Sequence, residues 1–124
     1  MGKELRKSTR FVEIGRVDAP DVCLFSGVLI DISSTGCKVK FPTNLELDTD
    51  CEYELKIICA RKEFSTPFIL IAHALWIKNM DNSCEIGFNI IRSPSTRDFE
   101  KFISSLEEEK SILDEENQLL ENLK

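Results

Sequence analysis

Hydrophobic and polar residues alternate along most of residues 11–91, the period expected of strands with one face in a core. Val, Ile and aromatic residues are frequent in these segments, as is typical of β-strands. Clusters of Pro, Gly, Asn, Asp and Ser between them favour turns. We therefore expect a mainly β fold, a small six-stranded antiparallel, split-barrel-like β-barrel within residues 11–94. The predicted strands cover residues 11–17, 21–32, 37–41, 51–59, 63–77 and 84–91.

The pattern changes after Ser93-Pro94-Ser95, and neither Pro nor Gly follows to the end of the sequence. Ser95 with Asp98 three residues later, or Ser93 before Pro94 at the first helical position, would start a helix. We therefore expect a long C-terminal helix within residues 95–124. Its first half has an apolar stripe suited to packing on the barrel, formed by Phe99, Phe102, Ile103 and Leu106.

The second half of this helix leaves two alternatives open. Steps of three and four predict a coiled-coil heptad with Leu at d and polar residues at a, in the order Ile103, Leu106, Lys110, Leu113, Asn117, Leu120. An Asn at a favours a parallel dimer, which predicts a homo-oligomer formed through residues 99–124 and altered by Asn117→Leu. Off the seam, Ile112, Leu119 and Leu123 would widen it or contact the barrel or a partner. The acidic runs fit a solvated tail instead.

Charge is distributed unevenly around a formal net charge of −6. Residues 1–16 carry five bases and two acids, whereas residues 97–124 carry four bases and nine acids. An acidic chain opposes binding to nucleic acid, RNA included, while a basic N-terminal segment suits a small anion. Neither a membrane span nor a secretory signal is evident, so we expect a cytoplasmic protein.

The cysteines and the single histidine predict neither a metal site nor an enzyme. The five cysteines include no C-x-x-C pair, and only His73 is available to join them. We expect them to be small apolar residues in a reducing compartment. Enzymatic activity is also unexpected, because a carboxylate cluster, a Gly-rich phosphate loop and a catalytic triad are all missing from the sequence. The cysteines are Cys23, Cys37, Cys51, Cys59 and Cys84.

Two short motifs contain the residues suited to binding a guanine nucleotide. Arg6 and Arg10 are four residues apart, and Asp31 begins an Asp-x-Ser-x-x-Gly run that includes Ser33 and Gly36. Guanidinium groups form bidentate contacts to phosphate oxygens and to the O6/N7 edge of guanine. A carboxylate accepts hydrogen bonds from the N–H edge of the same base.

The order and separation of these motifs resemble the signature of the PilZ family, bacterial domains that bind cyclic di-GMP, with RxxxR near the start and [D/N]xSxxG on the first long hairpin. Residues 72–76 (Ala-His-Ala-Leu-Trp) and 84–88 (Cys-Glu-Ile-Gly-Phe) resemble the family's late hairpin. The resemblance covers residues 5 to about 106. It implies a flexible leader over residues 1–10 that closes over the nucleotide.

The resemblance also implies a role for each motif residue. Arg6 and Arg10 would bracket the ligand, Asp31 would face the guanine N1/N2 donors, Ser33 would bind phosphate or base, and Gly36 would leave room for the ligand. An Arg in place of Leu5 would add a third stacking guanidinium, so Leu5 favours one ligand per subunit. Lys7 and Trp76 are secondary candidates; a Trp on a barrel strand is also common in cores. The local alternative is a turn in which Asp31 and Ser33 bind only backbone amides.

These expectations combine into a receptor that is not an enzyme and needs no cofactor. Cyclic di-GMP would bind, the leader would wrap around it, and the changed surface would act on a downstream protein. The family resemblance implies an output in motility, adhesion or surface-polymer secretion. The alternative is a PilZ-like interaction adaptor that does not bind nucleotide.

Overall fold

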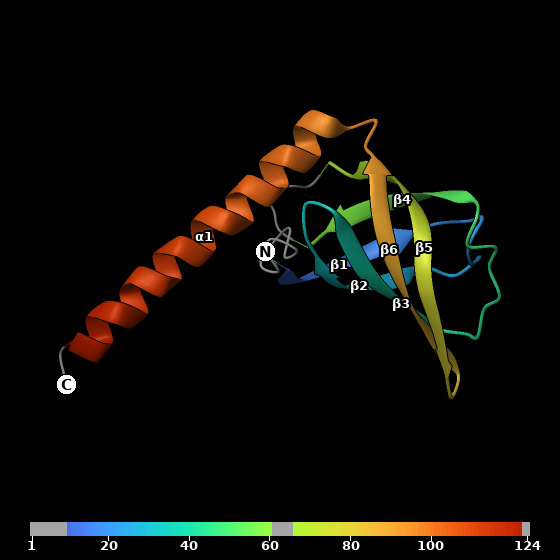
Figure 1. The fold of residues 1–124 in the computed structure, drawn as a ribbon, viewed down its shortest axis with the longest axis horizontal. Helices are drawn as coiled ribbons and strands as arrows, with labels where there is room; N and C mark the ends of the chain where they lie inside the picture. The colour runs from blue at the N-terminus through green and yellow to red at the C-terminus, as the bar shows by residue number, and fades with distance from the viewer. Residues whose placement is uncertain (1–9, 61–65, 123–124) are drawn as a thin grey trace, which may run out of the picture.

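The computed structural model describes residues 10–60 and 66–122, with the side chain of residue 122 excepted. In this part of the chain six strands precede one helix (Figure 1). The elements are β1 (Phe11–Asp18), β2 (Gly27–Ile32), β3 (Gly36–Phe41), β4 (Glu52–Cys59), β5 (Phe68–Met80), β6 (Ser83–Arg92) and α1 (Thr96–Asn122).

The strands form a closed antiparallel barrel, as the alternating pattern predicts, and their order in it is β1-β2-β3-β6-β5-β4. Closure comes from pairing between β1 and β4, with Val17 opposite Ile57. The two longest strands, β5 and β6, are joined by a tight turn at Asp81-Asn82, where Asn82 has φ 57°. Asn is among the residues that tolerate this left-handed conformation. The predicted late hairpin is therefore confirmed, with Trp76 opposite Gly87.

The barrel interior is filled by the inward-facing residues of all six strands. The largest fully buried side chains include Phe41, Phe68 and Phe88. Burying an aromatic or branched aliphatic side chain stabilises the fold by about 1.5–3 kcal/mol relative to leaving it exposed. Cys23, Cys37 and Cys84 are also buried and free, which fits their expected role as small apolar residues, whereas Cys51 is exposed.

The segment before β2 differs from the sequence prediction, because residues 21–26 form a loop and not the first half of a strand. The amides of Val22 and Cys23 both donate to the carbonyl oxygen of Ala19, at 2.8 and 2.9 Å. All three residues are buried, at 7% exposed or less. These residues therefore join the core from a turn, and apolar alternation alone does not distinguish this arrangement from a strand.

Helix α1 begins at Thr96, so Pro94 lies outside it and not at its first helical position. Ser95 precedes the helix, but its hydroxyl accepts a hydrogen bond from the amide of Ile69 at 3.3 Å. The hydroxyl of Ser93 donates to the carbonyl oxygen of Ile69 at 2.5 Å and accepts from the amide of Ser95 at 3.1 Å. These side chains therefore attach the start of α1 to β5.

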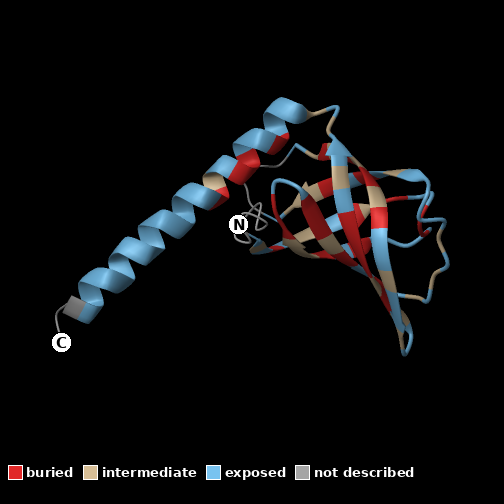
Figure 2. Cartoon of the chain, viewed as in Figure 1, coloured by how far each residue is buried: buried red, intermediate tan, exposed pale blue. Residues whose placement is uncertain are grey.

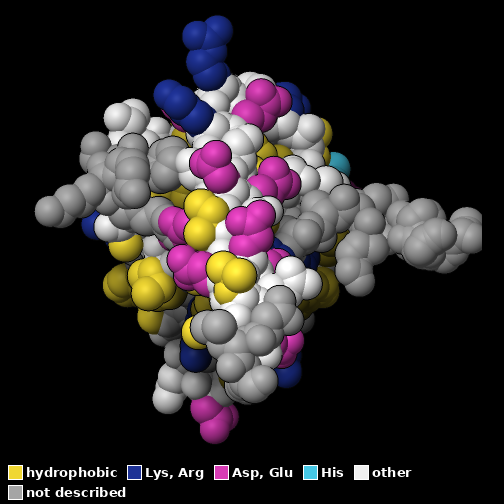
Figure 3. All heavy atoms as spheres, turned by 90° about the vertical axis from the view of Figure 1, so that its left-hand side faces the viewer, with side chains coloured by type: hydrophobic (Ala, Val, Ile, Leu, Met, Phe, Trp, Pro, Cys, Tyr) yellow, Lys and Arg dark blue, Asp and Glu magenta, His cyan; other side chains and the backbone are white. Residues whose placement is uncertain are grey.

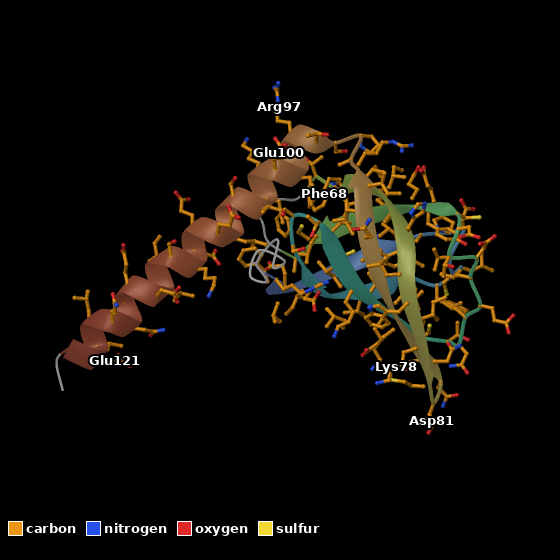
Figure 4. The ribbon with its side chains drawn as sticks, in the orientation of Figure 1. Phe68, Lys78, Asp81, Arg97, Glu100 and Glu121 are labelled. Atoms are coloured by element: carbon orange, nitrogen blue, oxygen red, sulfur yellow. The ribbon has the colours of Figure 1, made fainter. Side chains whose placement is uncertain are left out.

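The first half of α1 packs on one end of the barrel, as its apolar stripe predicts. Phe68 lies at this contact (Figure 4). The centroid of its ring is 5.7 Å from that of Phe99 and 5.3 Å from that of Phe102. Ile103 and Leu106 are also buried. Beyond Leu106 the helix extends away from the barrel with its side chains exposed (Figure 2). Ile103 and Leu106, the first two residues of the predicted heptad seam, thus pack on the barrel. Only the part of the seam from Lys110 onward is available for a coiled coil.

Candidate functional site

The two sequence motifs meet through Arg10 and Asp31. Arg10 immediately precedes β1, and Val12 two residues later is paired with Asp31 on β2. The Nη1 atom of Arg10 donates to the Oδ1 atom of Asp31 at 2.5 Å. The Asp31 side chain is 17% exposed, whereas that of Arg10 is 54% exposed. A guanidinium on the outer surface is therefore held by a mostly buried carboxylate.

A bulge in β2 places Asp31 on the outer face. Leu29 and Ile32 are three residues apart, yet both face the core, because the β2–β3 register shifts between Leu29 and Asp31. Without the bulge, residues three apart would point to opposite faces. The shift brings Asp31 opposite Lys38 on β3, with Lys38 Nζ 4.0 Å from Asp31 Oδ2.

Lys38 is a site residue that sequence reasoning missed. It lies two positions after Gly36 on a strand whose alternate residues, Cys37 and Val39, are fully buried. That alternation would have indicated that Lys38 faces outward. Its position beside Asp31 depends on the strand register, which the sequence pattern does not give. The outer face therefore carries a second cation beside the one predicted from the motifs.

Ser33 shapes the turn between β2 and β3. Its side-chain oxygen accepts from the amides of Thr35 and Gly36 at 3.2 and 3.1 Å. Its own amide donates to the carbonyl oxygen of Gly36 at 2.8 Å. Ser33 is only 2% exposed. The structure thus contains the local turn for Ser33, and direct contact between its hydroxyl and a ligand stays a prediction.

Gly36 is required by a close approach between strands. A Cβ atom on Gly36 would lie 2.7 Å from the carbonyl oxygen of Phe88 on β6 and 3.7 Å from the Nη2 atom of Arg10. Gly36 begins β3 and does not have a positive φ. The absence of a side chain therefore serves strand packing directly beneath the Arg10 guanidinium.

Trp76 lies at the end of an outward-facing row that starts at Asp31. The pairing runs from Asp31 to Lys38, then to Gly87 and to Trp76, across β2, β3, β6 and β5. Trp76 is 42% exposed, so it is not a core residue. Gly87 lacks a side chain, and its backbone is covered by the indole. Two cations, a carboxylate and an aromatic ring thus lie on one surface.

Cys37 follows Gly36 but points into the core and takes no part in this surface. Burial raises the pKa of its thiol to about 12, with a smaller contribution in the same direction from the negative charge of Asp31. The thiol therefore stays protonated at neutral pH and is a poor nucleophile.

A cleft of about 500 Å³ separates the end of β6 from the barrel-facing side of α1. Its lining includes Ser34 of the β2–β3 turn together with Phe99 and Ile103 of the helix. The same turn is bonded to β6, because the amide of Ile90 donates to the carbonyl oxygen of Thr35 at 2.8 Å. The turn that carries the second motif therefore lies between the Arg10–Asp31 pair and the base of α1.

Three predicted residues, Leu5, Arg6 and Lys7, lie outside the described residues, as does almost all of the predicted leader. Of the remaining five, Arg10, Asp31, Ser33 and Gly36 gather at one end of the β2–β3 hairpin, and Trp76 lies across the sheet from them. Among the helices in the described ranges, none is long and apolar enough to cross a membrane.

Comparisons with known proteins identify the family and the fold. The family model of the PilZ domain matches residues 4–108. A similar solved structure is that of the Bacillus subtilis Inhibitor of motility (MotI/DgrA), with a TM-score of 0.69 and 14% sequence identity. The match covers 85% of this chain and 50% of that one, so this chain spans half the length of that structure. At this identity the likeness concerns the fold. No curated protein matches the sequence.

Proposed function

Because the chain belongs to the PilZ domain family, we propose that it is a cytoplasmic, non-enzymatic receptor for cyclic di-GMP that acts on a downstream protein. The observation that supports this best is the contact between Arg10 and Asp31. It joins the two motifs across 21 positions of sequence, on an outer face where a ligand has access.

In the proposed complex the guanine N1 and N2 donors bind the carboxylate of Asp31. They displace Arg10, whose guanidinium then binds a phosphate oxygen or stacks on a base. The exchange leaves the Asp31 carboxylate with hydrogen-bond donors, because the guanine N–H groups take the place of the guanidinium. Arg6 supplies the second guanidinium, and Leu5 and Lys7 flank it. Ser33 and Gly36 keep the turn and the adjacent backbone in the shape that the ligand requires.

Lys38 and Trp76 extend the proposed site across the sheet. Lys38 lies within 4.0 Å of Asp31 and carries a positive charge suited to the second phosphate. Trp76 presents a half-exposed ring at the far end of the same row. An exposed indole is a suitable stacking surface for a purine. One bound nucleotide per subunit fits the presence of Leu5.

The signal has a direct physical route to α1. Ligand binding orders the leader and changes the contacts of the β2–β3 turn. This turn is hydrogen-bonded to β6 and borders the cleft under the helix. A change in the turn therefore alters the surface on which Phe99 and Ile103 pack. The output process is one of motility, adhesion or surface-polymer secretion; the similar MotI/DgrA structure carries the name of a motility inhibitor.

A second candidate function is an interaction adaptor that does not bind nucleotide. The observation in its favour is that Asp31 already has two cationic neighbours within the chain, Arg10 and Lys38. In that case the ion pairs would serve only to fasten β1 to the β2–β3 hairpin. Such a role requires neither the exposure of Arg10 nor an outward-facing Trp76.

Calorimetric titration with cyclic di-GMP separates the two functions, with separate titrations of GTP and cyclic di-AMP as controls. We expect selective binding by the natural chain and its loss in Arg10→Ala and Asp31→Ala. Arg16→Ala is the matched control, because Arg16 is an exposed β1 residue paired with Asp18 at 3.3 Å, away from this row. If the natural chain fails to bind at high micromolar ligand while remaining folded by circular dichroism, the adaptor is the correct function.

A further inference from the structure

The second half of α1 carries four large apolar side chains that the barrel does not cover. Ile112 is 52% exposed, Leu113 55%, Leu119 64% and Leu120 61%. They form two pairs with a seven-residue spacing, 112 with 119 and 113 with 120. Because seven residues are close to two helical turns, each pair forms a column along one side of the helix.

Glu116 lies at the centre of these four residues. It is four residues from Ile112 and Leu120, and three from Leu113 and Leu119. Residues three and four apart are neighbours on a helix surface, so each of the four side chains adjoins Glu116. We name these five residues the Glu116 patch. A carboxylate in the middle of an apolar surface sets a condition on any partner that covers it: the partner must supply a positive charge to Glu116.

Around the Glu116 patch the helix is strongly acidic. Residues 107–121 carry seven acids and one base, Lys110. Lys110 is itself near a carboxylate, with its Nζ atom 3.8 Å from Asp114 Oδ2. In Figure 3, acidic side chains lie among hydrophobic ones on the face from which the helix projects. Such a field attracts a basic surface and repels an acidic one.

A second copy of this chain does not meet the condition. Two copies pairing through the Glu116 patch would bring two acidic helix surfaces together, because Glu109 lies on the same side as Glu116, seven residues before it. They would also cover Glu116 without supplying a cation to it. Covering a carboxylate without a partner charge costs several kcal/mol, which offsets the gain from the apolar columns.

We propose that the Glu116 patch binds a helical segment of another protein that presents Arg or Lys to Glu116 and apolar side chains to the surrounding ring. Charge-assisted bonds to a carboxylate favour Arg, which forms two parallel bonds. The apolar columns supply contact area, and the acidic flanks select a basic partner. This inference does not depend on nucleotide binding, so it survives if the receptor function fails.

Self-association provides the first test, measured by light scattering on the full chain at tens of micromolar. We expect the natural chain to be monomeric and Glu116→Leu to self-associate, because the patch then becomes uniformly apolar. Glu107→Leu is the matched control: Glu107 lies nine residues before Glu116, on the opposite side of the helix. A dimeric natural chain, or a Glu116→Leu variant that stays monomeric, would overturn the proposal.

The second test uses two synthetic helical peptides of three heptads, both with Leu at a and d, one with Arg and the other with Glu at e and g. By fluorescence anisotropy we expect the Arg peptide alone to bind, more weakly as salt is raised. Glu116→Gln should weaken binding about fivefold and Glu107→Gln should leave it nearly unchanged, because only Glu116 lies within the contact. Equal binding of both peptides, or an unchanged affinity in Glu116→Gln, would refute the proposed partner chemistry.

Discussion

The indole of Trp76 on β5 occupies the space that a side chain on Gly87 of β6 would need, since a Cβ atom there would stand 2.2 Å from Trp76 Nε1. Gly87 in turn is opposite Lys38, which neighbours Asp31. The ring therefore lies in the same row of paired residues as Asp31, the carboxylate of the proposed nucleotide site, with Gly87 and Lys38 between them. This connection makes the ring a usable reporter of the site.

Trp76 is the sole tryptophan of the chain, so its fluorescence reports on this row alone. We expect cyclic di-GMP to quench or shift the emission of the natural chain, because a purine changes the polarity around a half-exposed indole. The Arg16→Ala variant should respond in the same way and Asp31→Ala should not. An emission spectrum unaffected by saturating ligand would exclude Trp76 from the site.

Replacing Lys38 by Met should weaken cyclic di-GMP binding about fivefold. Its charge is partly exposed and is therefore expected to contribute about 1 kcal/mol to binding. Lys40→Met is the matched control, because Lys40 is also an outward-facing residue of β3 but pairs with Val28 and Glu85 instead. Calorimetry on both variants measures the difference. Equal affinities would show that Lys38 does not reach the ligand.

Gly36→Ala should destabilise the fold by about 1–3 kcal/mol, the range for an added methyl group in a tight site. The new Cβ would lie 2.7 Å from the Phe88 carbonyl oxygen, so the β3 and β6 backbones must separate. Urea unfolding measures the change in the free energy of unfolding. Ser34→Ala, an exposed position in the same turn, should remain within about 0.5 kcal/mol of the natural chain.

Cys37 predicts a loss of stability at alkaline pH. Burial raises the pKa of its thiol from 9.0 to about 12, so above pH 9 the unfolded chain releases a proton that the folded chain retains. The part of the free energy of unfolding that depends on the protonated Cys37 thiol is fully present below pH 9. It is lost as pH rises towards 12, by about 1.4 kcal/mol per pH unit. Unfolding in urea at pH 8 and 10.5 should therefore show a smaller decline for Cys37→Ala than for the natural chain. Parallel declines would indicate that the folded protein admits the thiolate.

The barrel was predictable from the sequence because most strands bury alternate residues over much of their length, as β3 does with Cys37, Val39 and Phe41. The late hairpin was predictable as well. Residues 21–26 were not, because their apolar character serves burial in a loop at Val22 and Cys23. The hydrophobic periodicity of a sequence predicts which residues are buried. It does not distinguish burial in a strand from burial in a turn.

The site was predictable only in part, for a related reason. Arg10 and Asp31 are recognisable from motif spacing, whereas the place of Lys38 depends on a bulge between Leu29 and Asp31. A bulge shifts one side of a pairing by a residue, and the sequence of a single strand contains little sign of it. The same applies to Ser95, whose hydroxyl binds the distant Ile69 amide in place of the start of its own helix.

The geometry of α1 gives small movements at its base a large effect at its tip. Residues 96–106 form the part of the 27-residue helix that packs on the barrel, and the remaining residues, 107–122, extend about 24 Å beyond it. A rigid rod of that length, tilted by about 10° at its base, moves its far end by about 4 Å. The β2–β3 turn borders the cleft where such a tilt would begin. A tilt of α1 about its contact with Phe68 would therefore displace the Glu116 patch, which lies on the part of the helix beyond the barrel, more than it displaces the base.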